Sequence, residues 1–200
     1  GNPPGITDDM CDESLTADVV VVGAGISGIS AVRSAAEEGA SVIVVEQTDS
    51  FTARGLCFGA LDSSLQKELG CTYDNMQIVR EMQQYSGNRT NMGLWVKWAN
   101  ESGAAFDWFE EILKEDGRDF GYYLAMWPNP DNFDNDTEYY KQYCSSIQFV
   151  DWVGAVETQY NKTVELGAQY LFETTGKELI VENSAVKGVY AQKSDGSYIK

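Results

Sequence analysis

The chain has 200 residues, of which 43% are apolar and 12% aromatic, the composition of a folded globular protein and not of a disordered segment. Its 31 acidic and 14 basic residues give a net charge of −17. This disfavours a nucleic acid or an anionic membrane surface as a partner, because either requires a basic footprint. The chain contains no histidine, so it cannot assemble a Ser-His-Asp or Cys-His nucleophile, and we expect no metal site.

The N-terminal residues 1–16 are polar and contain two adjacent prolines, so we expect a flexible segment there. No signal peptide is recognisable, and no apolar run approaches the roughly 18 residues of a membrane-spanning helix, so we expect no membrane insertion. The cysteines show no CxxC spacing, and their even number is compatible with disulfide bonds without establishing them. They are Cys11, Cys57, Cys71 and Cys144.

A pattern of strand, glycine turn, helix and strand follows in residues 17–46. Val19–Val22 is a short β-branched run, typical of a parallel strand covered on both faces. Gly23, Gly25 and Gly28 then form a GxGxxG motif. The first glycine permits a sharp turn, the second lets a pyrophosphate approach the backbone, and the third lets the helix pack closely on the strand. The N-terminus of this helix offers free N–H groups to an anion.

The second strand of this unit, residues 41–45, ends in Glu46, 18 positions beyond Gly28. A carboxylate there is placed to accept hydrogen bonds from an adenosine ribose. GxGxxG alone also occurs by chance as a structural turn, but here the strand, helix, second strand and acid all fall in register. The sequence therefore predicts a Rossmann-type dinucleotide site, and Glu46 by itself suits FAD or NAD.

Residues 47–64 contain Gly55 and Gly59 and show no clear periodicity. Small residues so soon after the ribose acid fit either another close backbone approach to a ligand or an ordinary surface loop. We interpret residues 65–164 as a mainly helical insertion. Its aromatic residues are expected in helix packing and not in a ligand cage.

Within the insertion, apolar residues recur at helical spacing over 74–115, with an interruption at Gly103. Residues 117–136 are rich in Gly, Pro and Asn and predict an irregular loop that covers other structure. A further helix is predicted over 149–166.

The C-terminal residues predict a strand over 169–173 and then an antiparallel meander of three strands, separated by the turn signals Glu182-Asn183-Ser184 and Ser194-Asp195-Gly196. The fold class is therefore α/β. We expect a Rossmann-type domain, with a parallel sheet plus a β-meander, formed from residues 17–64 and 165–200 and interrupted by the helical insertion between its second and third parallel strands.

These segments resemble the flavoprotein family of fumarate reductases and succinate dehydrogenases, most closely its soluble bacterial branch of fumarate and urocanate reductases. The resemblance runs from about Ala17 to the last residue. It rests on VVVVGAGISGISAVRSAAEEGASVIVVEQ, similar to the family's FAD signature, and on TARGLCFGALDSS, which stands at the family's glycine-rich loop along the flavin. It rests further on the helical segment YSGNRTNMGLWVKWANESGAAFDWF and on the meander LGAQYLFETTGKELIVENSAVKGVYAQKSDGSYIK.

The resemblance implies FAD as the cofactor and a set of cofactor contacts, with a backbone group next to Lys177 touching the adenine. The implied contact residues are Gly23, Ala24, Gly25, Ile26, Ser27, Gly28, Glu46, Gln47, Ala53, Arg54, Gly55, Gly59, Ala60 and Lys177. The family usually has Asn-Thr at Arg54-Gly55 and Gly-Gly at Gly59-Ala60, so only backbone roles carry over there. Arg54 fits either a phosphate contact or a surface salt bridge.

For a full-length relative the resemblance implies reduction of the C=C bond of a small unsaturated acid or enone, with an electron donor as a further partner. The family's substrate-binding and proton-donating residues follow the meander, so we expect a truncated flavin domain with no catalytic residue. Two alternatives remain: a non-catalytic FAD-binding fragment or subunit that needs a second chain, and an NAD-dependent dehydrogenase. The same family suggests bacterial export and anaerobic respiration.

Overall fold

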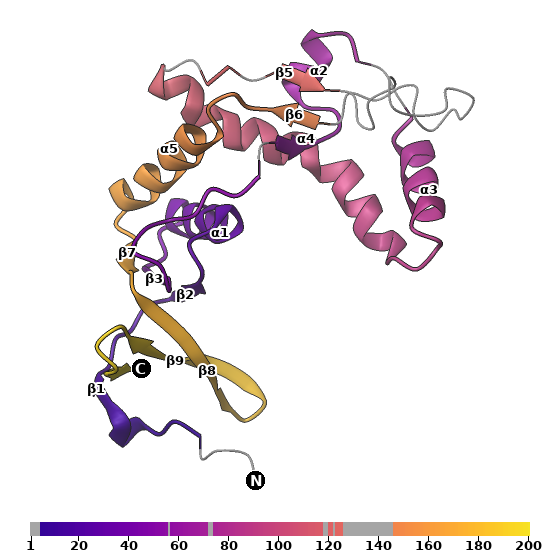
Figure 1. The fold of residues 1–200 in the computed structure, drawn as a ribbon. Helices are drawn as coiled ribbons and strands as arrows, with labels where there is room; N and C mark the ends of the chain where they lie inside the picture. The colour runs from indigo at the N-terminus through magenta and orange to yellow at the C-terminus, as the bar shows by residue number, and fades with distance from the viewer. Residues whose placement is uncertain (1–4, 56, 72–73, 118–119, 122, 126–145) are drawn as a thin grey trace. The chain divides into compact units, whose positions relative to one another are not determined.

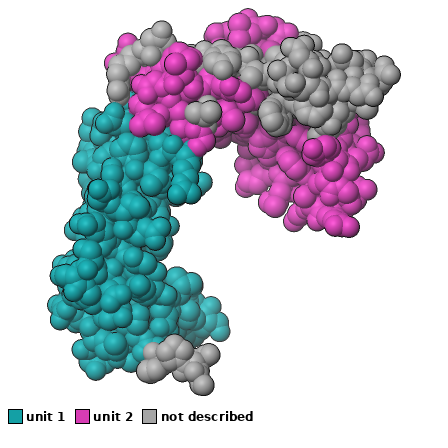
Figure 2. Space-filling view, viewed as in Figure 1, with its two compact units in different colours: residues 1–54, 156–200 teal, residues 55–155 magenta. Residues whose placement is uncertain are grey.

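The computed structural model describes residues 5–55, 57–71, 74–117, 120–121, 123–125 and 146–200 (Figure 1). The chain divides into two compact units, which Figure 2 colours separately. Unit 1 comprises residues 1–54 and 156–200, and unit 2 comprises residues 55–155. Helix α5 (Trp152–Glu165) carries the chain from unit 2 back into unit 1.

Unit 1 contains a three-stranded parallel sheet in the order β2-β3-β7. The strands are β2 (Val19–Val22), β3 (Val42–Val45) and β7 (Gln169–Leu171). Val19 lies opposite Val42, and every residue of β3 is buried, as expected for the central strand of a sheet that is covered on both faces. The predicted α/β class with a parallel sheet is confirmed.

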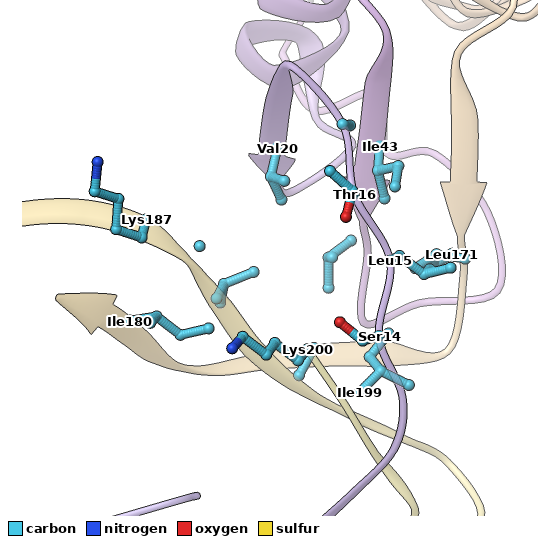
Figure 3. A pocket seen from close by; sticks show the side chains of 15 residues that line it. Ser14, Leu15, Thr16, Val20, Ile43, Leu171, Ile180, Lys187, Ile199 and Lys200 are labelled. Atoms are coloured by element: carbon cyan, nitrogen blue, oxygen red, sulfur yellow. The ribbon is translucent and has the colours of Figure 1, made fainter. Parts of the chain in front are cut away.

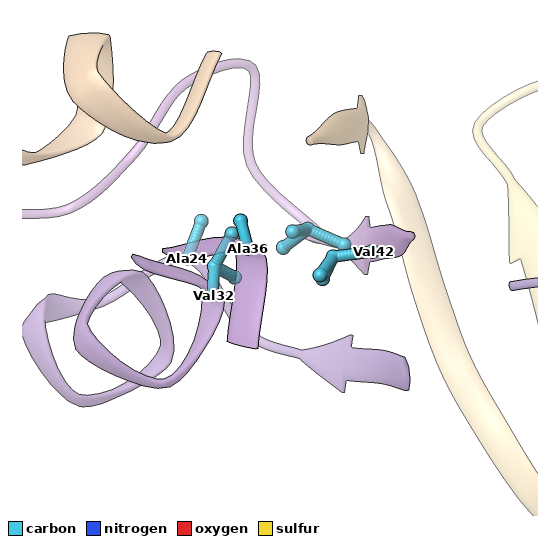
Figure 4. Packing of buried hydrophobic residues seen from close by; sticks show 5 residues of the cluster. Ala24, Val32, Ala36 and Val42 are labelled. Carbon is cyan, nitrogen blue, oxygen red and sulfur yellow. The ribbon is translucent and has the colours of Figure 1, made fainter. Parts of the chain in front are cut away.

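Helix α1 (Ile26–Glu37) covers one face of this sheet. The buried cluster between helix and sheet consists of Ala24, Val32, Ala36, Val42 and Val44 (Figure 4). Arg33 of α1 is also buried, and its guanidinium donates to Glu37 Oε1 (2.7 Å) and to Gln159 Oε1 of α5 (3.1 Å). These bonds compensate the buried cation and fix α1 against the part of α5 that belongs to unit 1.

A four-stranded sheet in the order β1-β10-β9-β8 contacts the parallel sheet through Val45, Ala191 and Ile199. Three of its strands form the predicted meander. They are β8 (Thr174–Glu182), β9 (Ala185–Lys193) and β10 (Tyr198–Ile199). The β8–β9 turn is Asn183-Ser184, with φ values of 50° and 63°, the two positive angles that a two-residue type I′ hairpin requires.

Residues 8–13 form regular structure, whereas the sequence predicted a flexible segment over residues 1–16. Asp8–Met10 forms a 3₁₀ turn (η1) and Cys11–Glu13 forms β1, which pairs parallel with β10. The Asp8 carboxylate accepts hydrogen bonds from the Tyr190 hydroxyl (2.5 Å) and from Lys200 Nζ (2.6 Å). Partners more than 180 residues away in the chain therefore order a segment whose own composition is typical of a linker.

Unit 2 is built around the long helix α4. Its other helices lie against α4. The helices are α2 (Ser64–Glu68), α3 (Asn75–Tyr85) and α4 (Met92–Asp116). Helix α4 runs unbroken through Gly103, where the sequence suggested an interruption. A Cβ at Gly103 would collide with the backbone carbonyl of Leu61, so this glycine serves close packing and not chain reversal.

Unit 2 also contains a small antiparallel sheet that the sequence analysis did not predict, in the order β4-β6-β5. Its strands are β4 (Cys57–Gly59), β5 (Tyr123–Ala125) and β6 (Ser146–Gln148). Phe109 of α4 lies at the centre of an aromatic cluster, in contact with Phe58, Phe149 and Trp152. The aromatic residues of this cluster serve packing, as the sequence predicted.

The remaining sequence-based expectations concern cysteines, metals and membrane spans. Cys11 and Cys57 are free thiols, and Cys144 lies outside the described residues. Among the described residues, no group of three or more His, Cys, Asp or Glu side chains is arranged to hold a metal ion, and no helix is long and apolar enough to cross a membrane. Most of the predicted loop over 117–136 also lies outside the described residues.

Candidate functional site

The three glycines of the motif are glycines for three different reasons. Gly23 has φ of +105°, a backbone conformation that side chains disfavour, and it makes the sharp turn at the end of β2. A Cβ at Gly28 would collide with the carbonyl oxygen of Gly23 and reach the Val21 side chain at 3.5 Å, so Gly28 allows α1 to pack on β2. These two requirements are internal to the fold.

Gly25 has no such internal requirement. Its φ of −79° and ψ of 176° are accessible to any residue. Among the described residues, the one atom near an added Cβ is Thr52 Oγ1, at 3.6 Å, which is ordinary van der Waals contact. The missing side chain therefore leaves an open space directly at the start of α1, the space that a closely approaching ligand backbone or phosphate would need.

The N-terminus of α1 has the electrostatic properties of an anion-binding site. Gly25 is its N-cap residue, no side chain of the described chain caps it, and its first turn contains no acidic residue. The first N–H groups of the helix and the positive end of its dipole thus point at the space beside Gly25. A phosphate group is the kind of ligand that this end of a helix binds.

Glu46, the residue after β3, is hydrogen-bonded to the glycine turn. Its Oε2 accepts a hydrogen bond from the backbone N–H of Ala24 (2.7 Å), and its Oε1 accepts from the backbone N–H (2.8 Å) and hydroxyl (2.7 Å) of Thr48. The residue is only 6% exposed. Burial raises the pKa of Glu46, but the hydrogen bonds from Ala24 and Thr48, with the smallest contribution from the backbone N–H of Gln47, outweigh it and hold the pKa below its usual range.

The start of the meander contacts the site through Glu173 and through Thr174, the first residue of β8. The N–H of Thr174 donates to the Glu46 carbonyl oxygen, and the N–H of Glu173 donates to that of Thr48, each over 2.8 Å. Further along β8, the pairing with β9 shifts between Gly176 and Glu178, so Lys177 has no partner in the described register. A bulge of this kind leaves backbone groups available to a ligand.

The structure places the predicted contact residues in both units. Unit 1 holds the motif Gly23–Gly28, which includes Ala24, Ile26 and Ser27, together with Glu46, Gln47, Ala53, Arg54 and Lys177. Ala24 is fully buried, whereas Ser27, Gln47, Arg54 and Lys177 are exposed. Within this unit, hydrogen bonds bring together the glycine turn, Glu46 and the start of β8.

Three predicted residues belong to unit 2. The carbonyl of Gly59 accepts from the indole N–H of Trp98 (3.0 Å), and the carbonyl of the fully buried Ala60 accepts from the Gln66 side chain (2.8 Å). Gly55 has φ of +101° and makes a turn before β4. Each of the three therefore has a structural role within its own unit.

Sequence reasoning missed two threonines of the site. Thr48 donates to Glu46, and Thr52 donates its N–H to the Ala24 carbonyl (3.0 Å) with its Oγ1 beside Gly25. A threonine two positions after a buried acid is a local signal for such a side-chain contact, because its hydroxyl and N–H can both reach the carboxylate. The bond from Thr52 to Ala24 had no signal in the sequence.

A separate cavity of about 320 Å³ lies between the parallel sheet and the meander in unit 1 (Figure 3). Apolar side chains such as Val20, Ile43, Leu171 and Ile180 line much of it, and Lys187 and Lys200 also reach it. Because none of the predicted cofactor residues lines this cavity, it is not part of the site at the glycine turn.

Comparison with protein families identifies the cofactor of this chain. Residues 18–200 match the family model described as FAD binding domain. The chain belongs to this family. FAD is therefore its cofactor, as predicted, and the alternative of a nicotinamide enzyme is not supported. The open space at Gly25, the uncapped end of α1 and the carboxylate of Glu46 suit the pyrophosphate and ribose of that cofactor.

One curated protein matches part of the chain. The chain is 31% identical over 115 residues to vinyl phenol reductase of Lactiplantibacillus plantarum, an alignment that covers 54% of this chain and 22% of that protein. The chain thus spans a minor part of the length of this relative.

Two solved structures share the fold at TM-scores of 0.70. One is a 3-ketosteroid-Δ4-(5α)-dehydrogenase from Rhodococcus jostii RHA1 in complex with 4-androstene-3,17-dione, 18% identical, with 95% of this chain and 44% of that one covered. The other is a flavocytochrome c3 fumarate reductase in an open conformation, 17% identical, with 98% and 35% covered. The predicted fold of the fumarate reductase flavoproteins is thereby confirmed.

Proposed function

We propose that unit 1 holds the adenosine diphosphate part of FAD at the glycine turn. The pyrophosphate lies at the N-terminus of α1 beside Gly25, the ribose hydroxyls donate to Glu46, and the adenine meets the backbone at the Lys177 bulge. The observation that carries this proposal is Gly25, a glycine that neither its backbone angles nor its neighbours require. Two further observations support it: the uncapped N-terminus of α1 and the buried carboxylate of Glu46.

The remaining contacts of the proposal follow the loop after Glu46. Gln47, Ala53 and Arg54 extend the contact along the phosphates, with the exposed Arg54 guanidinium suited to a bidentate phosphate contact.

We further propose that the chain is the FAD-binding part of a reductase for a carbon–carbon double bond. The names of its relatives support this reading: vinyl phenol, fumarate and 4-androstene-3,17-dione all contain a double bond conjugated to an aromatic ring or a carbonyl group. Bound FAD would supply the hydride for such a reaction, while the protein supplies binding and orientation. The substrate class is thus a small conjugated alkene, such as an unsaturated acid or enone.

Titration of the purified chain with FAD, followed by flavin fluorescence, tests the binding proposal. We expect saturable binding to the wild-type chain and a loss of at least tenfold in affinity for Gly25→Val, with an unchanged circular dichroism spectrum. Gly188→Ala is the matched control, because an added Cβ there would lie 3.4 Å from Ile180 Cδ1 and far in sequence from the turn. Equal affinity of Gly25→Val and wild type would overturn the proposal.

A second experiment separates a reductase from a non-catalytic FAD-binding protein. The FAD-loaded chain is reduced with dithionite under anaerobic conditions and mixed with fumarate, 4-vinylphenol or an enone. Reoxidation of the flavin with formation of the saturated product supports the reductase. Flavin that stays reduced with all three compounds would favour the non-catalytic alternative.

A further inference from the structure

The hydroxyl group of Thr48 has one hydrogen and two acceptors. Its Oγ1 lies 2.7 Å from Glu46 Oε1 and also 2.7 Å from the carbonyl oxygen of Ser50. A threonine hydroxyl donates one hydrogen bond at a time, so it satisfies either the carboxylate or the carbonyl. A rotation about one side-chain bond exchanges the two arrangements.

This choice sets how much of the Glu46 carboxylate is open to a ligand. A carboxylate has about four acceptor positions. The N–H groups of Ala24 and Thr48 occupy two of them, one on each oxygen, over 2.7 Å and 2.8 Å, while the Gln47 N–H makes only the smallest contribution to the carboxylate. When the Thr48 hydroxyl donates to Oε1 as well, one position remains, and when it turns to Ser50, two remain. A ribose diol brings two hydroxyl donors and needs both.

We propose that the Thr48 hydroxyl is a placeholder donor, which satisfies the Glu46 carboxylate in the unliganded chain and turns to the Ser50 carbonyl when ribose hydroxyls arrive. This inference rests on the proposed function of Glu46 as the ribose acceptor. Because Glu46 is 6% exposed, its carboxylate has little access to water, and a replaceable internal donor meets its need for hydrogen bonds.

The hydroxyl is not needed to orient Glu46. Both carboxylate oxygens are already fixed by backbone N–H groups, one from Ala24 and one from Thr48 itself. The loop that carries Thr48 is anchored independently, since the Glu173 N–H donates to its carbonyl and the Thr52 N–H donates to Ala24. Removing the hydroxyl therefore leaves the carboxylate in place.

The sign of the effect follows from these contacts. On binding, the wild-type chain exchanges a charge-assisted bond from Thr48 to Glu46 for a weaker neutral bond from Thr48 to Ser50. A Thr48→Val chain makes no such exchange, so it should bind a ribose-containing ligand about three- to tenfold more tightly. A residue that merely positions Glu46, or merely stabilises the loop, would weaken binding when changed.

The test uses ADP and 2′,3′-dideoxy-ADP as probes, with dissociation constants from NMR shift titrations of the wild-type, Thr48→Val and Thr48→Ser chains. We expect Thr48→Val to tighten binding of ADP and to leave that of dideoxy-ADP unchanged, while Thr48→Ser matches wild type. Carbon-13 titration of the Glu46 carboxyl should show a higher pKa in unliganded Thr48→Val than in wild type.

Two outcomes overturn the inference alone: ADP binding that is unchanged or weaker in Thr48→Val, or equal tightening for both nucleotides. Failure of the wild-type chain to bind either ADP or FAD would instead remove the proposed function, and the inference with it. The wild-type titration therefore tells the two failures apart.

Discussion

The backbone N–H of Ala24 donates to Glu46 Oε2 over 2.7 Å, across 22 residues of sequence. This bond joins the glycine turn after β2 to the end of β3. The carboxylate that we propose for ribose binding therefore also stabilises the turn that shapes the site. Stability and ligand binding are coupled at this residue.

Glu46→Gln should lower the free energy of unfolding by about 1–3 kcal/mol at pH 7, because it loses charge-assisted hydrogen bonds and turns an amide N–H₂ group toward a backbone donor. The measurement is chemical denaturation of both chains. The pH dependence identifies the cause. Since the folded-state pKa of Glu46 is lowered, its stabilisation is fully present above the unfolded value of about 4.3 and is lost as the pH falls through the folded value.

The difference between wild type and Glu46→Gln should accordingly be constant from pH 7 to about pH 5 and shrink below about pH 4. A difference that stays constant down to pH 3 would show that the charge of Glu46 is not what stabilises the turn.

Gly28→Ala should destabilise the chain by about 1–3 kcal/mol or more, because the new Cβ meets the Gly23 carbonyl, which is backbone and cannot move aside cheaply. Gly188→Ala serves as the control, since its Cβ reaches only ordinary contact with Ile180. Thermal unfolding of the two variants compares them directly. Similar melting temperatures for both would contradict the close packing of α1 on β2.

Phe109→Ala should cost about 3–5 kcal/mol, because Phe109 is 1% exposed and contacts three other rings of the aromatic cluster in unit 2. Leu94→Ala on the same helix should stay within about 0.5 kcal/mol, since Leu94 is 66% exposed. Denaturant midpoints measure both. Equal losses of stability for Phe109→Ala and Leu94→Ala would mean that the buried face of α4 is assigned wrongly.

Tyr190→Phe should loosen the N-terminal segment from the meander. The Tyr190 hydroxyl donates to Asp8, and this bond, with partial burial, raises the pKa of Tyr190 to about 12. Its contribution to stability is present below the unfolded value of about 10 and is lost as the pH rises toward 12. We expect faster amide exchange at Leu15 and Lys200 in the variant, and ultraviolet titration should lose one tyrosine that ionises near pH 12. Unchanged amide exchange in Tyr190→Phe would mean that the hydrogen bond from Tyr190 to Asp8 does not hold the N-terminal segment on the meander.

The elements that sequence reasoning found are those whose contacts are local or repeat regularly. β2, α1 and β3 follow one another within 27 residues, and their valines and alanines show the strand and helix periods directly. The β8–β9 hairpin is signalled by Asn183 and Ser184, which accept positive φ more readily than most residues. Such signals depend only on residues that are close in the chain, so they can be recognised from the sequence without the tertiary structure.

The elements that it missed are short and paired over long distances. β1 has only three residues, and it pairs with β10 across almost the whole chain. The strands β4, β5 and β6 have three residues each, too few for a period of two to become visible. Gly103 was interpreted as a helix break because its contact with the Leu61 carbonyl lies 42 residues away in the sequence.

The sequence by itself determined the family and the cofactor, because residues 18–200 match the FAD binding domain model, and three glycines and an acid at fixed spacing predicted a dinucleotide site. Only the tertiary structure decided which glycine leaves room for a ligand and which donors already occupy the Glu46 carboxylate. Those properties depend on atoms that folding brings together from β2, β3, the loop after β3 and β8, and no spacing along the chain encodes them.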